Sequence, residues 1–269
     1  HLEITDGDTL VVNGDLTIED GSINDGVIDL KGNLIANCVD GEGNDHCAGD
    51  REVTSSYDGR FGGGTTEIVF SGNVPQTYDF DVGARVPYVT INTTSTVSAA
   101  AGTTFSTDGF KLVNGTFNAP TGEMRIGYRS GWGEENTTKG FVISGGTFNH
   151  NNGSVSIDHW GKQSGGAKVM SLIDVPTSVN LNNLTVKIED VSSGGGYDDL
   201  LLSIAAGDTI NVAGDFSITD GYVTGGTINV SGNINFNYTD AGVLAESMGT
   251  TSLIMSGGSS TNLTVQAGA

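Results

Sequence analysis

The sequence predicts an all-β fold, and within that class a parallel β-solenoid (β-helix), from three observations. Residues 7–37 recur at residues 207–237 without a gap, at a constant shift of 207 − 7 = 200. Inside the first copy, residues 110–127 overlay residues 141–158 at a shift of 141 − 110 = 31. The 42 Gly, only 4 Pro and short runs of Val, Ile and Leu leave few helix formers. Repetition at these spacings is typical of solenoids and modular arrays.

Short strands of period two are expected wherever apolar and polar residues alternate. The turns between them carry Gly, Asn and Asp, as at Asn13-Gly14 and Asp25-Gly26, because tight corners need positive φ angles. The expected strands are Leu10–Val12, Leu16–Ile18, Val27–Leu30, a strand at Leu34, Ile68–Phe70, Val89–Ile91, Met124–Ile126, Val155–Ile157, Leu184–Val186, Ile210–Val212, Phe216–Ile218 and Ile234–Phe236.

Such strands also fit stacked β-sandwich modules, which remain the alternative. Repetition favours the solenoid, because each coil buries its apolar side on the next and coils can be added indefinitely. Coils of roughly 20 to 30 residues with a rise of about 4.8 Å would give a rod on the order of 50 Å long.

The expected organisation is a single elongated body over residues 1–269. Residues 7–206 form the first module and residues 207–269 a partial second copy. Residues 65–84 overlay 250–269 at a shift of 185, so the first copy holds 200 − 185 = 15 extra residues. Three projecting loops are expected: the insertion at 38–64, then 127–140 and 159–167. The match ends at Ala269 where the first copy continues past Ala84, which predicts an open strand edge that can pair with another chain.

The charge of the chain argues against several partners. A formal charge of −21, from 32 acidic and 11 basic residues, repels phosphate backbones, so nucleic acid is not expected as a partner. No apolar stretch of about 18 residues or more occurs, so membrane insertion is not expected either. The chain begins at His1 without an apolar leader, which suggests a mature secreted product or a fragment. An extracellular or cell-surface location is the resulting expectation.

The insertion contains the two cysteines, Cys38 and Cys47, and a cluster of oxygen donors. An even pair of cysteines in a secreted chain predicts a local disulfide. Alternating oxygen donors on a Gly-rich loop suit Ca²⁺, and the alternative is a solvated loop pinned by the disulfide. The candidate calcium ligands are Asp40, Glu42, Asn44, Asp45 and Asp50.

Aromatic residues gather in or beside the other two loops: Tyr128, Trp132, His159 and Trp160. Exposed aromatic faces stack on sugars or on a neighbouring subunit, so surface glycans are candidate partners. The alternative is that these rings roof the core beneath the loops.

Eight sequons would carry glycans if the source glycosylates its surface proteins. Their asparagines are Asn92, Asn114, Asn136, Asn152, Asn183, Asn229, Asn237 and Asn262.

Several phrases carry a resemblance to a known family: VNGTFNAPTGEMRI, SGGTFNHNNGSVSI and VAGDFSITDGYVTGGTINVSGNI. They resemble the coils of large secreted bacterial β-solenoid surface proteins, the filamentous-haemagglutinin and autotransporter-passenger adhesins. The resemblance implies surface display, adhesion or matrix building, and it brings no catalytic residues.

The expected function is therefore structural and not enzymatic. The chain is interpreted as a protomer or repeat segment of an extracellular filament or cell-surface adhesin that joins copies of itself head to tail. The alternative is a carbohydrate-binding adhesive module acting through the aromatic loops. A polysaccharide lyase or hydrolase is less favoured, because Lys and Arg form no cluster and Asp20 and Asp220 sit in Asp-Gly corners.

Overall fold

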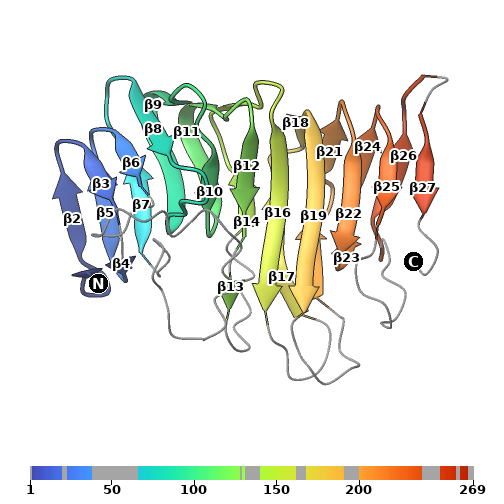
Figure 1. The fold of residues 1–269 in the computed structure, drawn as a ribbon, viewed down its shortest axis with the longest axis horizontal. Coiled ribbons are helices and arrows are strands. Elements are labelled where there is room, and N and C mark those ends of the chain that lie inside the picture. Colours follow the sequence, from blue (N-terminus) through green and yellow to red (C-terminus); the bar gives the residue numbers. More distant parts are fainter. Residues whose placement is uncertain are drawn as a thin grey trace. The chain divides into compact units, whose positions relative to one another are not determined.

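The computed structural model describes residues 2–19, 23–37, 66–127, 129–130, 140–161, 168–190, 200–237, 249–258 and 261–265. In these ranges every regular element is a β-strand, and the strands run side by side in parallel (Figure 1). This confirms the all-β class and the parallel solenoid, in place of antiparallel sandwiches. Within the described part of the chain, no helix has the length and hydropathy of a membrane span.

The chain divides into two compact units. Unit 1 comprises residues 1–125 and 143–151, and unit 2 comprises residues 126–142 and 152–269. The division does not coincide with the repeat boundary at residue 207. The single elongated body over residues 1–269 stays a prediction.

Unit 1 is built from two principal rows of parallel strands. One row runs β2-β5-β7-β9-β11, and the other pairs β3 with β6, β6 with β8, and β8 with the second half of β9. The strands are β1 (Leu2–Glu3), β2 (Thr9–Val12), β3 (Leu16–Ile18), β4 (Ile23–Asn24), β5 (Val27–Leu30), β6 (Leu34–Ala36), β7 (Glu67–Phe70), β8 (Gln76–Phe80), β9 (Tyr88–Ala99), β10 (Phe105–Thr107), β11 (Phe110–Asn118) and β15 (Thr147–Asn149). β12 (Glu123–Ile126) and β14 (Gly140–Ile143) contain points where the chain passes between units.

Unit 2 has three rows, one for each side of a coil. They are β17-β20-β23, β18-β21-β24-β26 and β16-β19-β22-β25-β27. The strands are β13 (Arg129–Ser130), β16 (Ser154–Gly161), β17 (Lys168–Asp174), β18 (Ser178–Leu181), β19 (Asn183–Asp190), β20 (Leu200–Ile204), β21 (Thr209–Val212), β22 (Phe216–Asp220), β23 (Tyr222–Thr224), β24 (Thr227–Val230), β25 (Ile234–Phe236), β26 (Ser252–Met255) and β27 (Leu263–Val265).

Both sequence repeats correspond to structural repeats. β2 and β21 begin at equivalent residues 200 positions apart, and β7 and β26 occupy residues 67–70 and 252–255, which are 185 apart. The shift of 31 is the length of one coil: Thr116 pairs with Thr147, and Arg129 pairs with Trp160.

The core lies inside the coils, on the inward side of each alternating strand. Ile28, Leu30 and Leu34 are completely buried. Unit 1 adds a cluster of contacting aromatic rings: Tyr78, Phe80, Phe105, Phe110, Phe117 and Phe148. The Tyr78 hydroxyl donates to the Asn118 carbonyl at 3.0 Å, and burial raises the pKa of Tyr78 well above its usual value.

Two glycines show why the corner pattern repeats. Gly26 and Gly226 adopt φ angles of +58° and +51°, and a Cβ on either would lie 2.3 Å from an isoleucine methyl carbon, on Ile4 or Ile204. Only glycine fits both the conformation and the space. The Asp25-Gly26 turn of the sequence is thus a required corner.

The predicted loops differ from the structure at their edges. Residues 38–64 lie outside the described residues. Within 127–140, Arg129–Ser130 form β13 and Gly140 begins β14. The loop predicted to start at His159 is wrong in its first three residues, because β16 continues to Gly161. Its paired strand β19 supplies a full set of partners, from Asn183 to Asp190, and so extends the ladder.

Candidate functional site

The most distinctive surfaces are the outer edges of the first coil of unit 1 and the last coil of unit 2. In each, four apolar residues face inward, because their partners in the next row belong to the core or its margin. We name these the first-coil quartet and the last-coil quartet. The first-coil quartet is Leu10, Val12, Leu16 and Ile18, and the last-coil quartet is Leu253, Met255, Leu263 and Val265.

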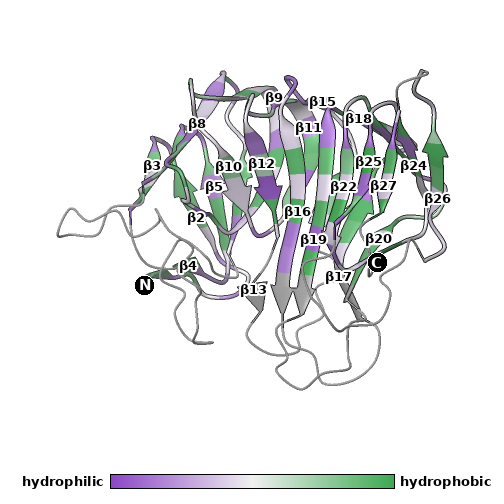
Figure 2. Cartoon of the chain, turned by 45° about the vertical axis from the view of Figure 1, so that its right-hand side comes forward, coloured by the Kyte–Doolittle hydropathy of each residue, from purple (hydrophilic) through white to green (hydrophobic). Residues whose placement is uncertain are grey.

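Apart from Ile18, these inward residues remain at least partly accessible. Leu10 is 41% exposed, whereas Leu263 and Val265 are 53% and 54% exposed. Figure 2 shows the hydrophobic colouring on β26. The counterparts in the other copy of the repeat are buried: Ile210, Val212, Phe216 and Ile218 for the first coil, and Ile68, Phe70, Tyr78 and Phe80 for the last coil.

The backbone explains this difference. β21 pairs with β18 on one side and β24 on the other, whereas the described residues give β2 a partner only in β5. Likewise β26 pairs with β24 and β27 with β25, each on one side among the described strands. On the side away from these partners, the backbone N–H and C=O groups of β2, β3, β26 and β27 pair with no other described strand, and groups of this kind can accept another strand.

A ladder of Asn and Asp side chains runs through the corner at which β19, β22, β25 and β27 begin. Its members are the first residue of β19 and the residue directly before each of the other three strands. Asn183 Oδ1 accepts from the Asp215 N–H at 2.9 Å, Asp215 Oδ1 from the Asn233 N–H at 2.8 Å, and Asn233 Oδ1 from the Asn262 N–H at 3.2 Å. Unit 1 repeats the pattern: Asp15 Oδ1 accepts from the Asn33 N–H at 2.8 Å. We call this the corner ladder, and it ties each coil to the next in one register.

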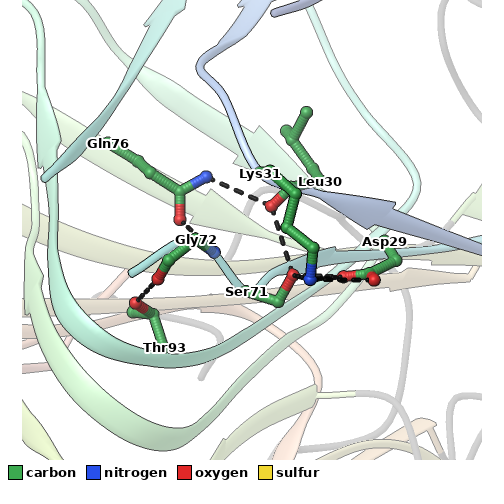
Figure 3. Close-up of polar contacts among 7 residues, drawn as sticks. All are labelled: Asp29, Leu30, Lys31, Ser71, Gly72, Gln76 and Thr93. Atoms are coloured by element: carbon green, nitrogen blue, oxygen red, sulfur yellow. Dashed lines mark hydrogen bonds and ion pairs between the residues drawn. The ribbon is translucent and has the colours of Figure 1, made fainter. Parts of the chain in front are cut away.

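A polar cluster in unit 1 is the strongest candidate for chemistry (Figure 3). Lys31 Nζ lies 2.9 Å from Asp29 Oδ2 and 2.9 Å from Ser71 Oγ, and Ser71 donates to Asp29. The hydrogen bond from Ser71, followed by the hydrogen bond and charge of Lys31, lowers the pKa of Asp29 against the opposing effect of burial.

A serine beside a lysine suggests a nucleophile and its base, but a base must be neutral. Lys31 is instead ion-paired with the Asp29 carboxylate. In the second copy, Ser231 and Ser256 stand where the first has Lys31 and Ser71, 3.4 Å apart between hydroxyl oxygens. The cluster therefore fastens neighbouring coils.

Beside it, a buried glutamine completes the same corner. Gln76 Nε2 donates to the Leu30 carbonyl at 3.2 Å, and Gln76 Oε1 accepts from the Gly72 N–H at 2.9 Å. Thr93 donates to the Gly72 carbonyl. These bonds satisfy buried backbone groups, as a corner without regular pairing requires (Figure 3).

Most of the predicted site residues lie outside the described residues: Cys38, Asp40, Glu42, Asn44, Asp45, Cys47, Asp50, Tyr128, Trp132 and Asn136. The disulfide and the calcium loop stay predictions. In the described ranges, no three His, Cys, Asp or Glu side chains are grouped to hold a metal ion.

His159 is not an exposed aromatic residue. It is completely buried, because it continues the inward series of Val155 and Ile157 along β16 and pairs with Ile188. Trp160 follows it in the same strand, in register with Arg129 and Glu189. His159 is therefore not part of a surface that could contact sugars.

The described sequons fall into two groups. Asn92, Asn114, Asn152 and Asn237 are exposed. Asn183, Asn229 and Asn262 have their side-chain amides engaged with neighbouring coils: Asn229 Nδ2, for example, donates to Asn211 Oδ1 at 3.2 Å. A glycan on one of these three would break that contact.

No family model, curated protein or solved structure matches this chain. Open strand edges are predicted from the sequence, whereas the two quartets and the corner ladder are not. The signal was present, because Asp15, Asn33, Asp215 and Asn233 match at the shift of 200.

Proposed function

We propose that this chain is a non-catalytic structural protein, a protomer or repeat segment of an extracellular filament or cell-surface adhesin. Copies join head to tail, with the last coil of one against the first coil of the next. The carrying observation is that the quartet residues other than Ile18 are accessible although their counterparts in the other copy are buried.

The occupant of each edge is a second copy of this chain, and the internal repeat supports that choice. The coil at residues 209–218 has the strands of the first coil, and it is covered by a parallel β-coil that includes β18. What fits the first coil is therefore another coil of the same kind. Among the described residues, β26 and β27 form a coil of this kind whose inward residues are accessible.

Burying these residues supplies the driving force. Each buried aliphatic side chain gains about 1.5 to 3 kcal/mol relative to full exposure, and the partly exposed quartets would realise part of this. When the last coil of one copy binds the first coil of another, the resulting dimer still has one open first coil and one open last coil. Further copies can therefore add at both ends. The acidic, Gly-, Thr- and Asn-rich composition supports an extracellular place for such an assembly.

The test uses two variants and a matched control. Leu10→Asp disables the first-coil edge and Leu263→Asp the last-coil edge, while Val82→Asp places the same charge at a 74% exposed valine outside both quartets. Sedimentation velocity and electron microscopy at rising concentration measure assembly. The parent and Val82→Asp should form extended assemblies, and each edge variant alone should remain monomeric.

Mixing the two edge variants is the decisive measurement. Leu10→Asp keeps its last coil and Leu263→Asp its first coil, so the mixture should stop at a dimer. A parent chain that stays monomeric up to high concentration would overturn the proposal. So would a Leu263→Asp variant that dimerises with itself, because the contact would then join two first coils.

A further inference from the structure

We infer that copies join in a single parallel register, with β26 of one copy on β2 of the next and β27 on β3. Ser252 then lies opposite Thr9, and Leu263 lies opposite Leu16. This inference rests on the proposed function and specifies the partner residues of the same surface.

The corner ladder fixes this register. Asp215 lies between Asn183 of the preceding coil and Asn233 of the following coil. In the inferred register, Asp15 lies between Asn262 of the preceding copy and Asn33 of its own chain. Asp15 would thus have an asparagine on both sides, as Asp215 has, and along the described strands β26 and β27 no carboxylate would face another.

The strand spacing of the two edges is already compatible within unit 2. In the last coil, β26 and β27 begin 263 − 252 = 11 residues apart, whereas β24 and β25 begin 234 − 227 = 7 apart, and the two coils nevertheless pair along both strands. In the first coil, β2 and β3 also begin 16 − 9 = 7 residues apart. The last coil would therefore pair on both of its sides with strands that begin 7 residues apart, β24 and β25 on one side and β2 and β3 of the next copy on the other.

The outward residues agree with the same alignment. On the row of β18, β21 and β24 the outward residues are Asn180, Asn211 and Asn229, joined by side-chain hydrogen bonds. The series ends in Ile254, which is 47% exposed, and the first coil of the next copy would place Val11, 51% exposed, directly opposite. Opposed β-branched side chains are a favourable cross-strand pair.

Other registers lose these matches. A slip of one residue would turn a quartet from the inward to the outward side, since side chains alternate. A slip of two residues keeps the alternation but moves Asp15 away from Asn262, and Val11 away from Ile254.

Cysteine cross-linking in the full chain tests the register. Thr17 and Thr264 are exposed and would be direct neighbours across the joint. Neighbouring parallel strands lie about 4.8 Å apart, within reach of a disulfide, whereas a two-residue offset separates the Cα atoms by about 8 Å, beyond its reach. Thr17→Cys mixed with Thr264→Cys is compared with Glu19→Cys mixed with Thr264→Cys. The parent chain, with Cys38 and Cys47 unchanged, is the blank.

The expected result is at least about tenfold more cross-linked dimer from the 17–264 pair than from the 19–264 pair, given that geometric limit. Assembly with equal or greater cross-linking of the 19–264 pair would overturn the register and leave the proposed function standing. Absence of assembly in the parent would overturn both.

A charge exchange gives a second readout that needs no cross-link. Asn262→Asp would place a carboxylate against Asp15, and should weaken assembly by at least about tenfold, the usual order for like charges in contact. Adding Asp15→Asn should restore assembly. Asn237→Asp, on an exposed residue after β25, is the matched control. An Asn262→Asp variant that assembles like this control would contradict the register.

Discussion

Leu10 and Ile210 occupy the same position in the two copies of the repeat, yet Leu10 is 41% exposed and Ile210 is completely buried. Their strands pair alike with the following coil: Leu10 lies opposite Ile28, and Ile210 opposite Ile228. Only the preceding side differs, where Ile210 also pairs with Val179. Burial in this fold is therefore decided by the neighbouring coil as much as by the residue.

The same contrast appears in polar and backbone groups. Asp208 is buried and accepts a hydrogen bond from the Val175 N–H at 2.7 Å, whereas Asp8 is exposed. A Cβ at Gly214 would lie 2.2 Å from Asn183 Oδ1, whereas a Cβ at Gly14 would meet nothing within 4 Å. A residue that contacts little in the first copy can therefore hold a neighbouring coil in the second. Such equivalent residues are matched pairs for mutation.

The largest expected difference is between Ile210→Asp and Leu10→Asp. Ile210→Asp buries an unpaired carboxylate in the core and should cost more than about 4 kcal/mol of unfolding free energy. Leu10→Asp should cost under about 1 kcal/mol in the isolated chain, because its carboxylate reaches water. Urea unfolding followed by circular dichroism measures both. Equal losses would contradict the open first coil.

Asp208→Ala and Asp8→Ala extend the comparison of unfolding free energies to a pair of equivalent polar residues. Removing the Asp208 carboxylate leaves the buried Val175 N–H without its acceptor, and should cost about 1 to 3 kcal/mol. The Asp8 variant should lie within about 0.5 kcal/mol of the parent, as an exposed substitution does. The same urea titration applies, and a costly Asp8→Ala would show that Asp8 is engaged.

Gly214→Ala against Gly14→Ala tests the space between coils. The methyl group added by Gly214→Ala would push against Asn183, so a loss of about 1 to 2 kcal/mol is expected. Gly14→Ala should be nearly neutral in the monomer, yet it should impair assembly, because the preceding copy would bring its corner to that position. A Gly14→Ala chain that assembles normally would argue against the joint.

The smallest effect concerns the ion pair between Asp29 and Lys31, which the second copy replaces with Asn229 and Ser231. Asp29→Asn with Lys31→Ser installs the residues of the second copy, and should cost less than about 1 kcal/mol at pH 7, as exposed ion pairs do. The folded-state pKa of Asp29 is lowered from 3.8, so its contribution is complete above that value and is lost as the pH falls through the lower folded-state pKa. The double variant should therefore lose less stability than the parent on acidification, as measured by urea unfolding across that range.

Local patterns in the sequence predicted 12 strands, each of which overlaps one of the 27 strands among the described residues, because alternation marks which residues face inward. They missed the length of β9, which runs through Thr93 although that stretch lacks apolar alternation. Thr93 is held by its bond to the Gly72 carbonyl, a contact across coils that no local pattern reveals. His159 was wrongly predicted to lie in a loop. It is a polar residue that follows the inward-facing Val155 and Ile157, and polarity alone is typical of loops. An open strand edge was predicted from the repeat, but the residues that are accessible on each edge depend on strand pairing between coils, which local patterns do not reveal.

The one-sided pairing of the first coil has a kinetic consequence. Among the described strands, β2 and β3 pair only with β5 and β6, whereas in the proposed assembly the last coil of another copy would add partners on their other side. Preformed ends would then act as seeds for growth. Assembly from monomer should show a lag phase that added fragments of the assembly remove.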